Sequence, residues 1–279
     1  MYAVKCIDKN KIQGTKDLHN LQNEIAIMAE IRSPHVVALR DATKTHSNYY
    51  LAMELCNGGD LDGFRKARGG FLQEQEARLI LRQIMKGIQA IKEKNVMHRD
   101  LKLPNVMINF AELAPNICTK GEFVLKDYIA HFDFKTQHQT LTCKIADLGF
   151  ARKLDEDQLA KTGCGTPLLM APEVLSGQLY NHKADVWSLG CLFYELLTGF
   201  MPFTGISHQN LRDNLKKGVF KIPKSVKISL QGVSFLQACL QYETSKRISW
   251  QDIVSHPYIA SEDFEGHLDL TLSYIGGHN

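Results

Sequence analysis

The chain has 279 residues, of which 44% are hydrophobic and 23% are charged, and its formal net charge is +3. These values exclude an intrinsically disordered or collagen-like chain, and seven cysteines without a C-x-x-C pair exclude a disulfide-rich scaffold. The numbers of basic and acidic residues, 33 and 30, are nearly equal, so the net charge does not favour binding to nucleic acid or to a membrane surface. Because no secretory signal opens the chain and no apolar run has spanning length, we expect a cytoplasmic protein with reduced thiols and no membrane span.

The first part of the chain predicts three strands and one helix. Alternating side chains predict a strand over residues 2–7. Apolar residues spaced three and four apart predict a helix around residues 18–28, which ends before Pro34. Two further strands are expected at residues 36–40 and 49–55.

A glycine-rich break and a helix-rich remainder follow. The run Asn-Gly-Gly-Asp at residues 57–60 predicts a hinge between two lobes. Apolar positions on one face predict a long amphipathic helix over residues 71–94. After residue 180 the pattern is mostly helical and includes an apolar, buried helix over residues 186–197, and residues 261–279 are expected to form a tail.

Residues 96–105 carry the most informative motif, V-M-H-R-D-L-K-L-P-N. Asp100 can orient a hydroxyl and accept its proton, Lys102 can stabilise charge on a moving phosphoryl group, and Asn105 can hold Mg²⁺. A solvated polar loop is the alternative interpretation. The short string H-R-D alone can arise by chance, but H-R-D-L-K-x-x-N is specific, so the sequence predicts phosphoryl transfer.

On these residues the chain resembles a eukaryotic Ser/Thr protein kinase over residues 1–259. The resemblance implies an α+β, bilobal fold with a partial N-lobe and hinge at 1–56, a mainly helical C-lobe at 57–259 and a tail at 260–279. It also implies ATP and Mg²⁺ as cofactors and a protein with a Ser or Thr acceptor as substrate. Three strings, C-N-G-G-D-L and those at 145–152 and 247–257, are most similar to ULK-type autophagy-initiation kinases, although Polo, Aurora and calmodulin-dependent kinases share parts of them.

The resemblance assigns three residues to the phosphate end of the nucleotide. Ala3, Val4 and Lys5 match the lysine strand of the family, and alternation places Ala3 on the same face as Lys5. Ala3 would pack on adenine and Lys5 would reach the phosphates. Glu24 matches the ion-pair partner of that lysine, although taken alone it would be an exposed helix charge.

The hinge motif of the family matches Met53 to Cys56. Met53 takes the gatekeeper position, and the backbones of Glu54 and Cys56 would bond adenine. Asp60 would bond the ribose, and a turn-forming Asp is the alternative. Met107, two residues beyond the metal-binding amide, would form the apolar floor under adenine.

Asp147 stands where the family has the metal-binding aspartate of D-F-G. The next residue is Leu148 where the family has Phe, so we expect a changed balance between active and inactive states more than a changed chemistry. If Leu148→Phe left activity and nucleotide affinity unchanged, that expectation would be wrong.

The resemblance also implies an activation segment. Thr166 would bridge Asp100 and Lys102, which favours Ser/Thr over Tyr substrates. Thr162 matches an activating phosphosite, and its phosphate would pair with Arg99; an unmodified loop threonine is the alternative. The segment from G-T-P to A-P-E is typical of peptide substrates, which argues against a small-molecule kinase.

Two structural supports are expected in the larger lobe. Asp185 would fix the backbone of the catalytic loop, and Arg247 would pair with Glu173.

The glycine-rich phosphate loop of the family has no counterpart before Lys5, because only four residues precede it. The small sheet would therefore expose an unpaired edge beside the lysine strand. Two explanations stand: a truncated gene model, which the otherwise complete set of catalytic residues favours, or a weak kinase or pseudokinase that acts as a scaffold.

An insertion is expected near residues 110–142. The 41 residues between Asn105 and Asp147 exceed the roughly 15 that a hairpin needs by about 25 to 30. Its aromatic content argues against a disordered linker, and it is a candidate contact for a regulatory partner or for packing on the large lobe. Four candidate metal ligands lie in it or directly after it, and their spacing fits no standard zinc pattern: Cys118, His131, His138 and Cys143.

Overall fold

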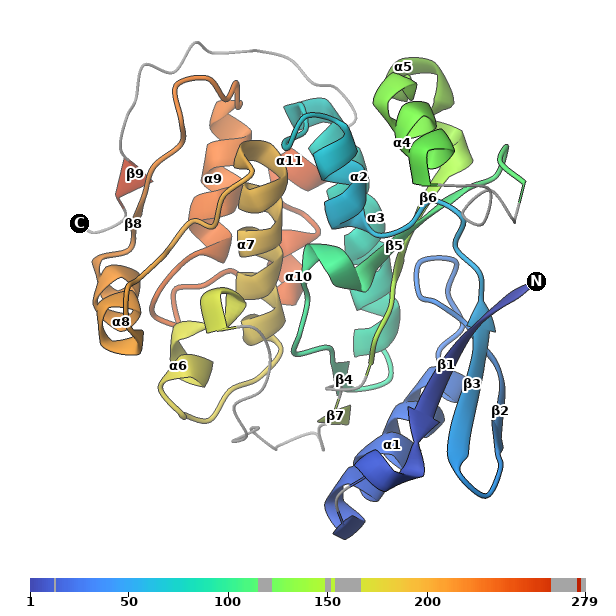
Figure 1. The fold of residues 1–279 in the computed structure, drawn as a ribbon. Helices are drawn as coiled ribbons and strands as arrows, with labels where there is room; N and C mark the ends of the chain where they lie inside the picture. Colours follow the sequence, from blue (N-terminus) through green and yellow to red (C-terminus); the bar gives the residue numbers. More distant parts are fainter. Residues whose placement is uncertain (13, 115–121, 149–151, 154–166, 262–274, 277–279) are drawn as a thin grey trace. The chain divides into compact units, whose positions relative to one another are not determined.

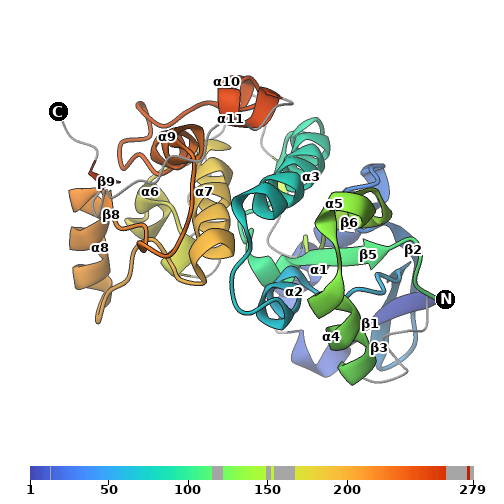
Figure 2. The ribbon, with the colours of Figure 1, turned by 90° about the horizontal axis from the view of Figure 1, so that it is seen from above.

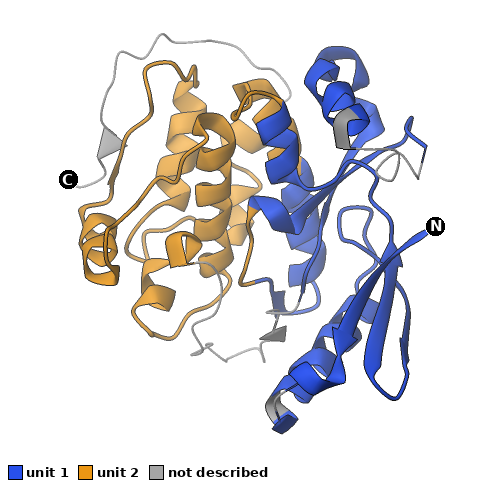
Figure 3. Cartoon of the chain, in the orientation of Figure 1, with its two compact units in different colours: residues 1–67, 83–98, 103–155 blue, residues 68–82, 99–102, 156–279 orange. Residues whose placement is uncertain are grey.

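The computed structural model describes residues 1–12, 14–114, 122–148, 152–153, 167–261 and 275–276 (Figure 1). The chain divides into two compact units (Figure 3). Unit 1 comprises residues 1–67, 83–98 and 103–155, and unit 2 comprises residues 68–82, 99–102 and 156–279. These limits differ from the lobes expected at 1–56 and 57–259, a division that stays a prediction.

Unit 1 begins with an antiparallel sheet of three strands in the order β1-β3-β2. These are β1 (Tyr2–Asp8), β2 (Leu39–Lys44) and β3 (Asn48–Glu54) (Figure 1). The helix α1 (Gly14–Glu30) contacts β2. The expected alternation along the first strand is present, since its exposed and half-buried side chains alternate from Tyr2 to Ile7. Within the described residues β1 pairs only with β3, so it is an edge strand as expected.

The strand expected at residues 36–40 was placed too early. β2 begins at Leu39 and runs on to Lys44. The residues before it bond elsewhere: the Val37 N–H donates to the Ile145 carbonyl at 2.8 Å, and the Ile145 N–H donates to the His35 carbonyl at 2.9 Å. Val36 and Val37 are both buried, which explains why their apolar side chains resembled those of a strand. The backbone at these residues bonds to Ile145, which lies more than 100 residues later in the sequence.

The rest of unit 1 combines short strands with helices, and its second half contains a β5–β6 hairpin. The elements are α2 (Leu61–Ala67), the second half of α3 (Glu74–Lys92), β4 (Val96–Met97), the 3₁₀ turn Leu103–Asn105, β5 (Val106–Phe110), α4 (Glu122–His131), α5 (Phe134–Gln137), β6 (Leu141–Ile145) and β7 (Arg152–Lys153). In the hairpin Val106 pairs with Ile145 and Phe110 with Leu141.

The expected insertion forms helices α4 and α5, which lie beside α2 (Figures 1 and 2). A cluster of five rings, which we call the aromatic cluster, joins them to α2 and β5: Phe64, Phe110, Tyr128, Phe132 and Phe134. The centroids of neighbouring rings lie 5.0 to 6.4 Å apart. The described part of the insertion is therefore packed into the core of unit 1.

Unit 2 is mainly helical around α7 (Lys183–Thr198), which is buried along nearly its whole length as expected. The glycine at residue 190 allows α9 to approach, because a Cβ there would lie 2.7 Å from the Cys239 Cβ. The other elements are the first half of α3, the 3₁₀ turn Pro167–Leu169, α6 (Pro172–Leu175), α8 (His208–Lys217), β8 (Val219–Phe220), α9 (Leu230–Cys239), α10 (Trp250–Ile253), α11 (Pro257–Ala260) and β9 (Ile275–Gly276). The expected α+β class is confirmed.

No helix in the described part of the chain combines the length and the apolar character that crossing a bilayer requires. The five described cysteines are free thiols, of which Cys6 is exposed. The other four are buried: Cys56, Cys143, Cys191 and Cys239.

Candidate active site

Three of the predicted phosphate and metal residues meet in unit 1. The Lys5 Nζ lies 2.8 Å from the Glu24 Oε1 and 3.6 Å from the Asp147 Oδ1. Burial alone would lower the pKa of Lys5, but the hydrogen bonds and charges of Glu24 and Asp147 outweigh burial and raise it. The amine therefore stays charged, as a phosphate-binding cation must.

The local sequence explains how Glu24 reaches this lysine. Glu24 and Met28 lie four residues apart on α1, so they share one helix face, and both side chains are buried. Lys5 lies on the half-buried face of β1, opposite the exposed Val4. A charged residue buried on the inner face of a helix needs a partner, and Lys5 is that partner.

The β5–β6 hairpin brings Asn105 and Asp147 to the same end of unit 1. Val106 pairs with Ile145, and the Ala146 N–H donates to the Asn105 carbonyl at 2.8 Å. Asp147 has φ 58°, a left-handed conformation that is uncommon for a residue with a side chain. A carboxylate and an amide oxygen are the ligand types that Mg²⁺ prefers, so these residues fit the expected metal.

The peptide before Asp147 is also held from the other side. A ring nitrogen of the buried His98 bonds the Ala146 carbonyl at 3.1 Å, and because a carbonyl only accepts, the histidine donates. The motif residue His98 is thus a structural support for the backbone that carries Asp147. Leu148, which follows, is buried.

The hinge residues lie at the end of β3, and the Glu54 side chain has a defined partner there. Its carboxylate accepts from the Ala38 N–H at 2.9 Å and lies 3.2 Å from the Lys144 Nζ. The sequence predicted a role only for the Glu54 backbone and did not identify Lys144. Burial raises the pKa of the neighbouring Cys56 to about 11, so this thiol stays protonated.

Asp60 and Met107 are adjacent in unit 1, where they form an isolated antiparallel bridge. The Asp60 Oδ1 accepts from the Gly63 N–H at 2.8 Å, which is the turn and helix-cap role that the sequence left open. The neighbouring Gly58 has no room for a side chain, because a Cβ there would lie 2.7 Å from Ile108.

The catalytic-loop pair lies in unit 2. The Lys102 Nζ is 2.6 Å from the Asp100 Oδ2, and Asp100 is only 4% exposed. The Arg99 N–H donates to the Asp185 Oδ1 at 3.0 Å, which is the backbone support that the sequence predicted for Asp185. Arg99 has φ 71°, and its guanidinium lies 5.8 Å from the centre of the Tyr180 ring.

The predicted site residues divide between the two units, and the structure describes their contacts within each unit separately. Unit 1 holds Lys5, Glu24, Asn105 and Asp147, together with the hinge, whereas unit 2 holds Asp100 and Lys102. The predicted regulatory residues Thr162 and Thr166 lie outside the described residues.

The model of the protein kinase domain matches residues 1–259. The chain belongs to the protein kinase family. Members of this family use ATP and Mg²⁺, and they phosphorylate proteins.

Several curated relatives are serine/threonine-protein kinases. The chain is 32% identical to ATG1 of Eremothecium gossypii over 91% of its length, and 35% identical to ULK1 of Homo sapiens over 92%. It is 33% identical to ULK3 of Rattus norvegicus over 93% of its length. The chain spans 28%, 22% and 49% of these three relatives. The expected resemblance to ULK-type kinases is confirmed.

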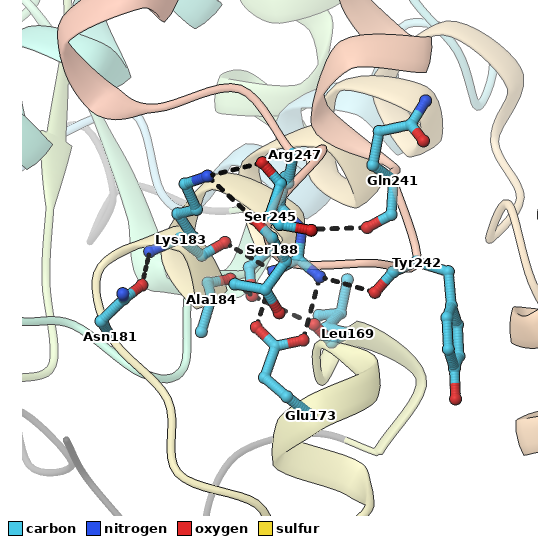
Figure 4. A network of polar contacts seen from close by, with 11 residues as sticks. Leu169, Glu173, Asn181, Lys183, Ala184, Ser188, Gln241, Tyr242, Ser245 and Arg247 are labelled. Carbon is cyan, nitrogen blue, oxygen red and sulfur yellow. Dashed lines mark hydrogen bonds and ion pairs between the residues drawn. The ribbon is translucent and has the colours of Figure 1, made fainter.

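The structural pair expected late in this kinase domain is present in unit 2 (Figure 4). The Arg247 guanidinium donates to both carboxylate oxygens of Glu173, at 2.7 and 2.9 Å, and both side chains are buried. Arg247 also donates to the carbonyls of Lys183 and Gln241, at 2.9 and 3.1 Å. The buried positive charge of Arg247 is therefore balanced by the Glu173 carboxylate, and its other N–H groups bond to backbone carbonyls.

The candidate metal ligands of the insertion do not converge in the described part of this kinase domain. Cys118 lies outside the described residues, and no group of three or more metal-binding side chains occurs within them. His131 is exposed beside Asp127, whereas Cys143 is buried.

Proposed function

We propose that this chain transfers the γ-phosphoryl group of ATP to a Ser or Thr hydroxyl of a protein. The observation that carries the proposal is the ion pair of Lys5 with the buried Glu24, with Asp147 beside the same amine. A lysine fixed between two carboxylates, with its pKa raised, is prepared to hold phosphate oxygens while one carboxylate holds a metal. A protein without nucleotide chemistry has no evident use for this arrangement.

The binding roles follow the family pattern. Lys5, positioned by Glu24, would hold the phosphates, and Asn105 with Asp147 would hold Mg²⁺. The bound metal would neutralise charge on the phosphates. The adenosine end would be bound by the following residues: Ala3, Met53, Met107, the backbones of Glu54 and Cys56, and the second carboxylate oxygen of Asp60.

Asp100 acts as the base in the transfer step. It accepts the proton of the acceptor hydroxyl as that oxygen bonds to the γ-phosphorus, and the bond from the γ-phosphorus to the bridging oxygen breaks to release ADP. Lys102 stabilises the negative charge on the transferred group. Its Nζ lies 2.6 Å from the Asp100 Oδ2, so Lys102 also orients the carboxylate that accepts the proton.

Regulation and domain limits belong to the same proposal. Thr166 would hold the Asp100–Lys102 pair in place, and a phosphate on Thr162 would pair with Arg99. The kinase domain is taken as residues 1–259 with a tail at 260–279. A regulatory partner would contact the insertion at 110–142 on its outer face, where Val124 is exposed.

Transfer of radiolabelled phosphate from ATP to a mixture of basic and neutral Ser/Thr peptides, in the presence of Mg²⁺, tests the proposal on the full chain. Asp100→Asn should lower the rate by about 10²–10⁴-fold while leaving the Mg-ATP thermal shift in place, because it removes only the base. Lys5→Met should reduce both readouts, and Lys11→Met, at an exposed lysine, should change neither.

Nucleotide binding without any transfer would overturn the enzymatic proposal and favour a pseudokinase scaffold. Absence of both binding and transfer would overturn the assignment of the nucleotide site itself.

A further inference from the structure

A run of lysines in unit 2 plays no part in the proposed transfer. Five lysines occur between residues 216 and 227, and all five are exposed: Lys216, Lys217, Lys221, Lys224 and Lys227. No Asp or Glu occurs between Asp213 and Glu243. Within the described part of the chain, no carboxylate forms an ion pair with Lys216, Lys217, Lys224 or Lys227. We call residues 216–227 the lysine segment.

The lysine segment contains a strand edge that already accepts another strand. β8 lies at its centre and pairs antiparallel with β9 from the end of the chain, with Phe220 opposite Ile275 and Val219 opposite Gly276 (Figure 1). The Phe220 side chain is buried, whereas Val219 is exposed. An extended segment can therefore bind here through backbone hydrogen bonds while charged side chains lie on both sides of it.

The chain that leads to β9 has the opposite charge. Residues 248–279 contain no Lys or Arg. Residues 262–274 contain four carboxylates: Glu262, Asp263, Glu265 and Asp269. The four carboxylates of this acidic segment nearly balance the charge of the five lysines in the lysine segment.

The residues just before the acidic segment are bonded to two arginines of α3. The Arg78 Nε donates to the Tyr258 carbonyl at 2.6 Å, and the Arg82 Nε donates to the Ile259 carbonyl at 2.9 Å. Both guanidinium groups also donate to the Ser261 carbonyl. The chain is therefore bonded to unit 2 at residue 261, before the acidic segment, and again at β9, after it.

We propose that the lysine segment is a docking surface for an acidic, extended polypeptide, and that residues 262–276 of this chain are its occupant. Strand pairing at β8 supplies the register and the lysines supply the charge. The surface then distinguishes acidic from basic segments, because a basic segment at the same edge would meet like charges. Acidic segments of other proteins compete with the chain's own residues for this surface.

Zero-length carbodiimide cross-linking of the full chain, followed by mass spectrometry, tests the proposal. We expect amide cross-links between lysines 216–227 and carboxylates 262–269, formed within one chain and reduced severalfold at 1 M NaCl, where the Debye length falls to about 3 Å. An equimolar mixture of ¹⁴N and ¹⁵N chains separates links within one chain from links between two copies.

Hydrogen exchange gives a readout that does not depend on the cross-linked groups. The variant Lys216→Ser/Lys217→Ser and the variant Glu262→Gln/Asp263→Asn/Glu265→Gln should each speed exchange severalfold in peptides that contain β8 and β9. The control Lys44→Ser/Lys94→Ser removes two exposed lysines of unit 1 and should leave this exchange unchanged.

Three outcomes would overturn the proposal. The first is an absence of links to the acidic segment, and the second is links only between isotopically different chains, which would assign the surface to a second copy. The third is unchanged exchange in both variants together with lysine-dependent binding to anionic vesicles or heparin, which would make the lysines a lipid or nucleic-acid surface.

Discussion

Arg247 and Glu173 form an ion pair in which both side chains are buried. Removing one partner leaves the other as an unpaired charge in the core, so Arg247→Ala should lower the unfolding free energy of unit 2 by about 3–5 kcal/mol. Equilibrium urea denaturation measures this change.

The matched control is the neighbouring Lys246, whose ammonium pairs with Glu243 at 3.1 Å on the surface. Lys246→Ala should cost no more than about 1 kcal/mol, because exposed pairs contribute little. Equal costs for the two substitutions would contradict a structural role for the buried pair.

His35 makes the stability of unit 1 depend on pH. Burial, together with the charges of Lys86 and Lys144, lowers its pKa below 6.5, and its Nδ1–H donates to the Cys143 carbonyl at 3.1 Å. Between the lowered pKa and 6.5 the unfolded chain binds a proton that the folded chain does not. The unfolding free energy should therefore fall as the pH drops from about 7 to 5.

His35→Gln keeps a donor for the Cys143 carbonyl but cannot be protonated, so it should flatten this fall. Urea midpoints measured across the pH range check the result, and His19→Gln, at an exposed histidine, is the control. A decline as steep in His35→Gln as in the parent chain would assign the pH dependence to other groups.

At the residue scale, the kinase motifs predicted those ion pairs whose two partners both belong to a motif. Lys5 with Glu24 and Arg247 with Glu173 were expected and are present. The Glu54–Lys144 pair was missed, because its partners are 90 residues apart and neither belongs to a motif that specifies the other. Such contacts depend on which strands become neighbours, and a single sequence does not contain that information locally.

At the scale of elements, the insertion depends on its aromatic cluster. Phe132 is buried and its ring lies 5.1 Å from that of Phe110 and 5.2 Å from that of Phe134. Phe132→Ala should cost about 3–5 kcal/mol, because it removes this packing and leaves a cavity. Limited proteolysis should then cut within α4 or α5 before it cuts elsewhere in unit 1.

The control is Val124 of α4, the helix that ends just before Phe132, and its side chain is 46% exposed. Val124→Ala should change stability by no more than about 0.5 kcal/mol. A similarly small effect of Phe132→Ala would mean that the insertion is held by contacts other than these rings.

Element prediction succeeded where the pattern was long and failed where it was short. The helix expected at residues 71–94 is α3 (Glu74–Lys92), whose many turns repeat one apolar face. Residues 36–40 form only a short apolar run, in which the backbone of the buried Val37 bonds to Ile145 and β2 begins at Leu39. The aromatic residues of the insertion indicated an ordered segment, but its two helices and their packing on α2 depended on tertiary contacts.

At the scale of the whole molecule, α3 is one continuous helix that contributes to both units. The two tryptophans of the chain, Trp187 and Trp250, both lie buried in unit 2. Their fluorescence therefore reports on unit 2 alone. If the shared helix couples the units, Phe132→Ala in unit 1 should lower the urea midpoint of tryptophan fluorescence as well as that of circular dichroism.

Coincident midpoints in both the parent chain and the variant would support coupled unfolding. A lowered midpoint by circular dichroism, with an unchanged fluorescence midpoint, would show that the units unfold separately.

The exposure of the described cysteines allows one of them to be labelled selectively. Cys6 is exposed on β1, whereas burial raises the pKa of Cys56, Cys143, Cys191 and Cys239. Maleimides react with the thiolate, so the four buried cysteines are slow targets and Cys6 is the fast one among the described cysteines. A dye at Cys6 sits next to Lys5 in sequence but on the opposite face of the strand. Its emission can follow events at the phosphate-binding lysine without occupying that lysine's surroundings.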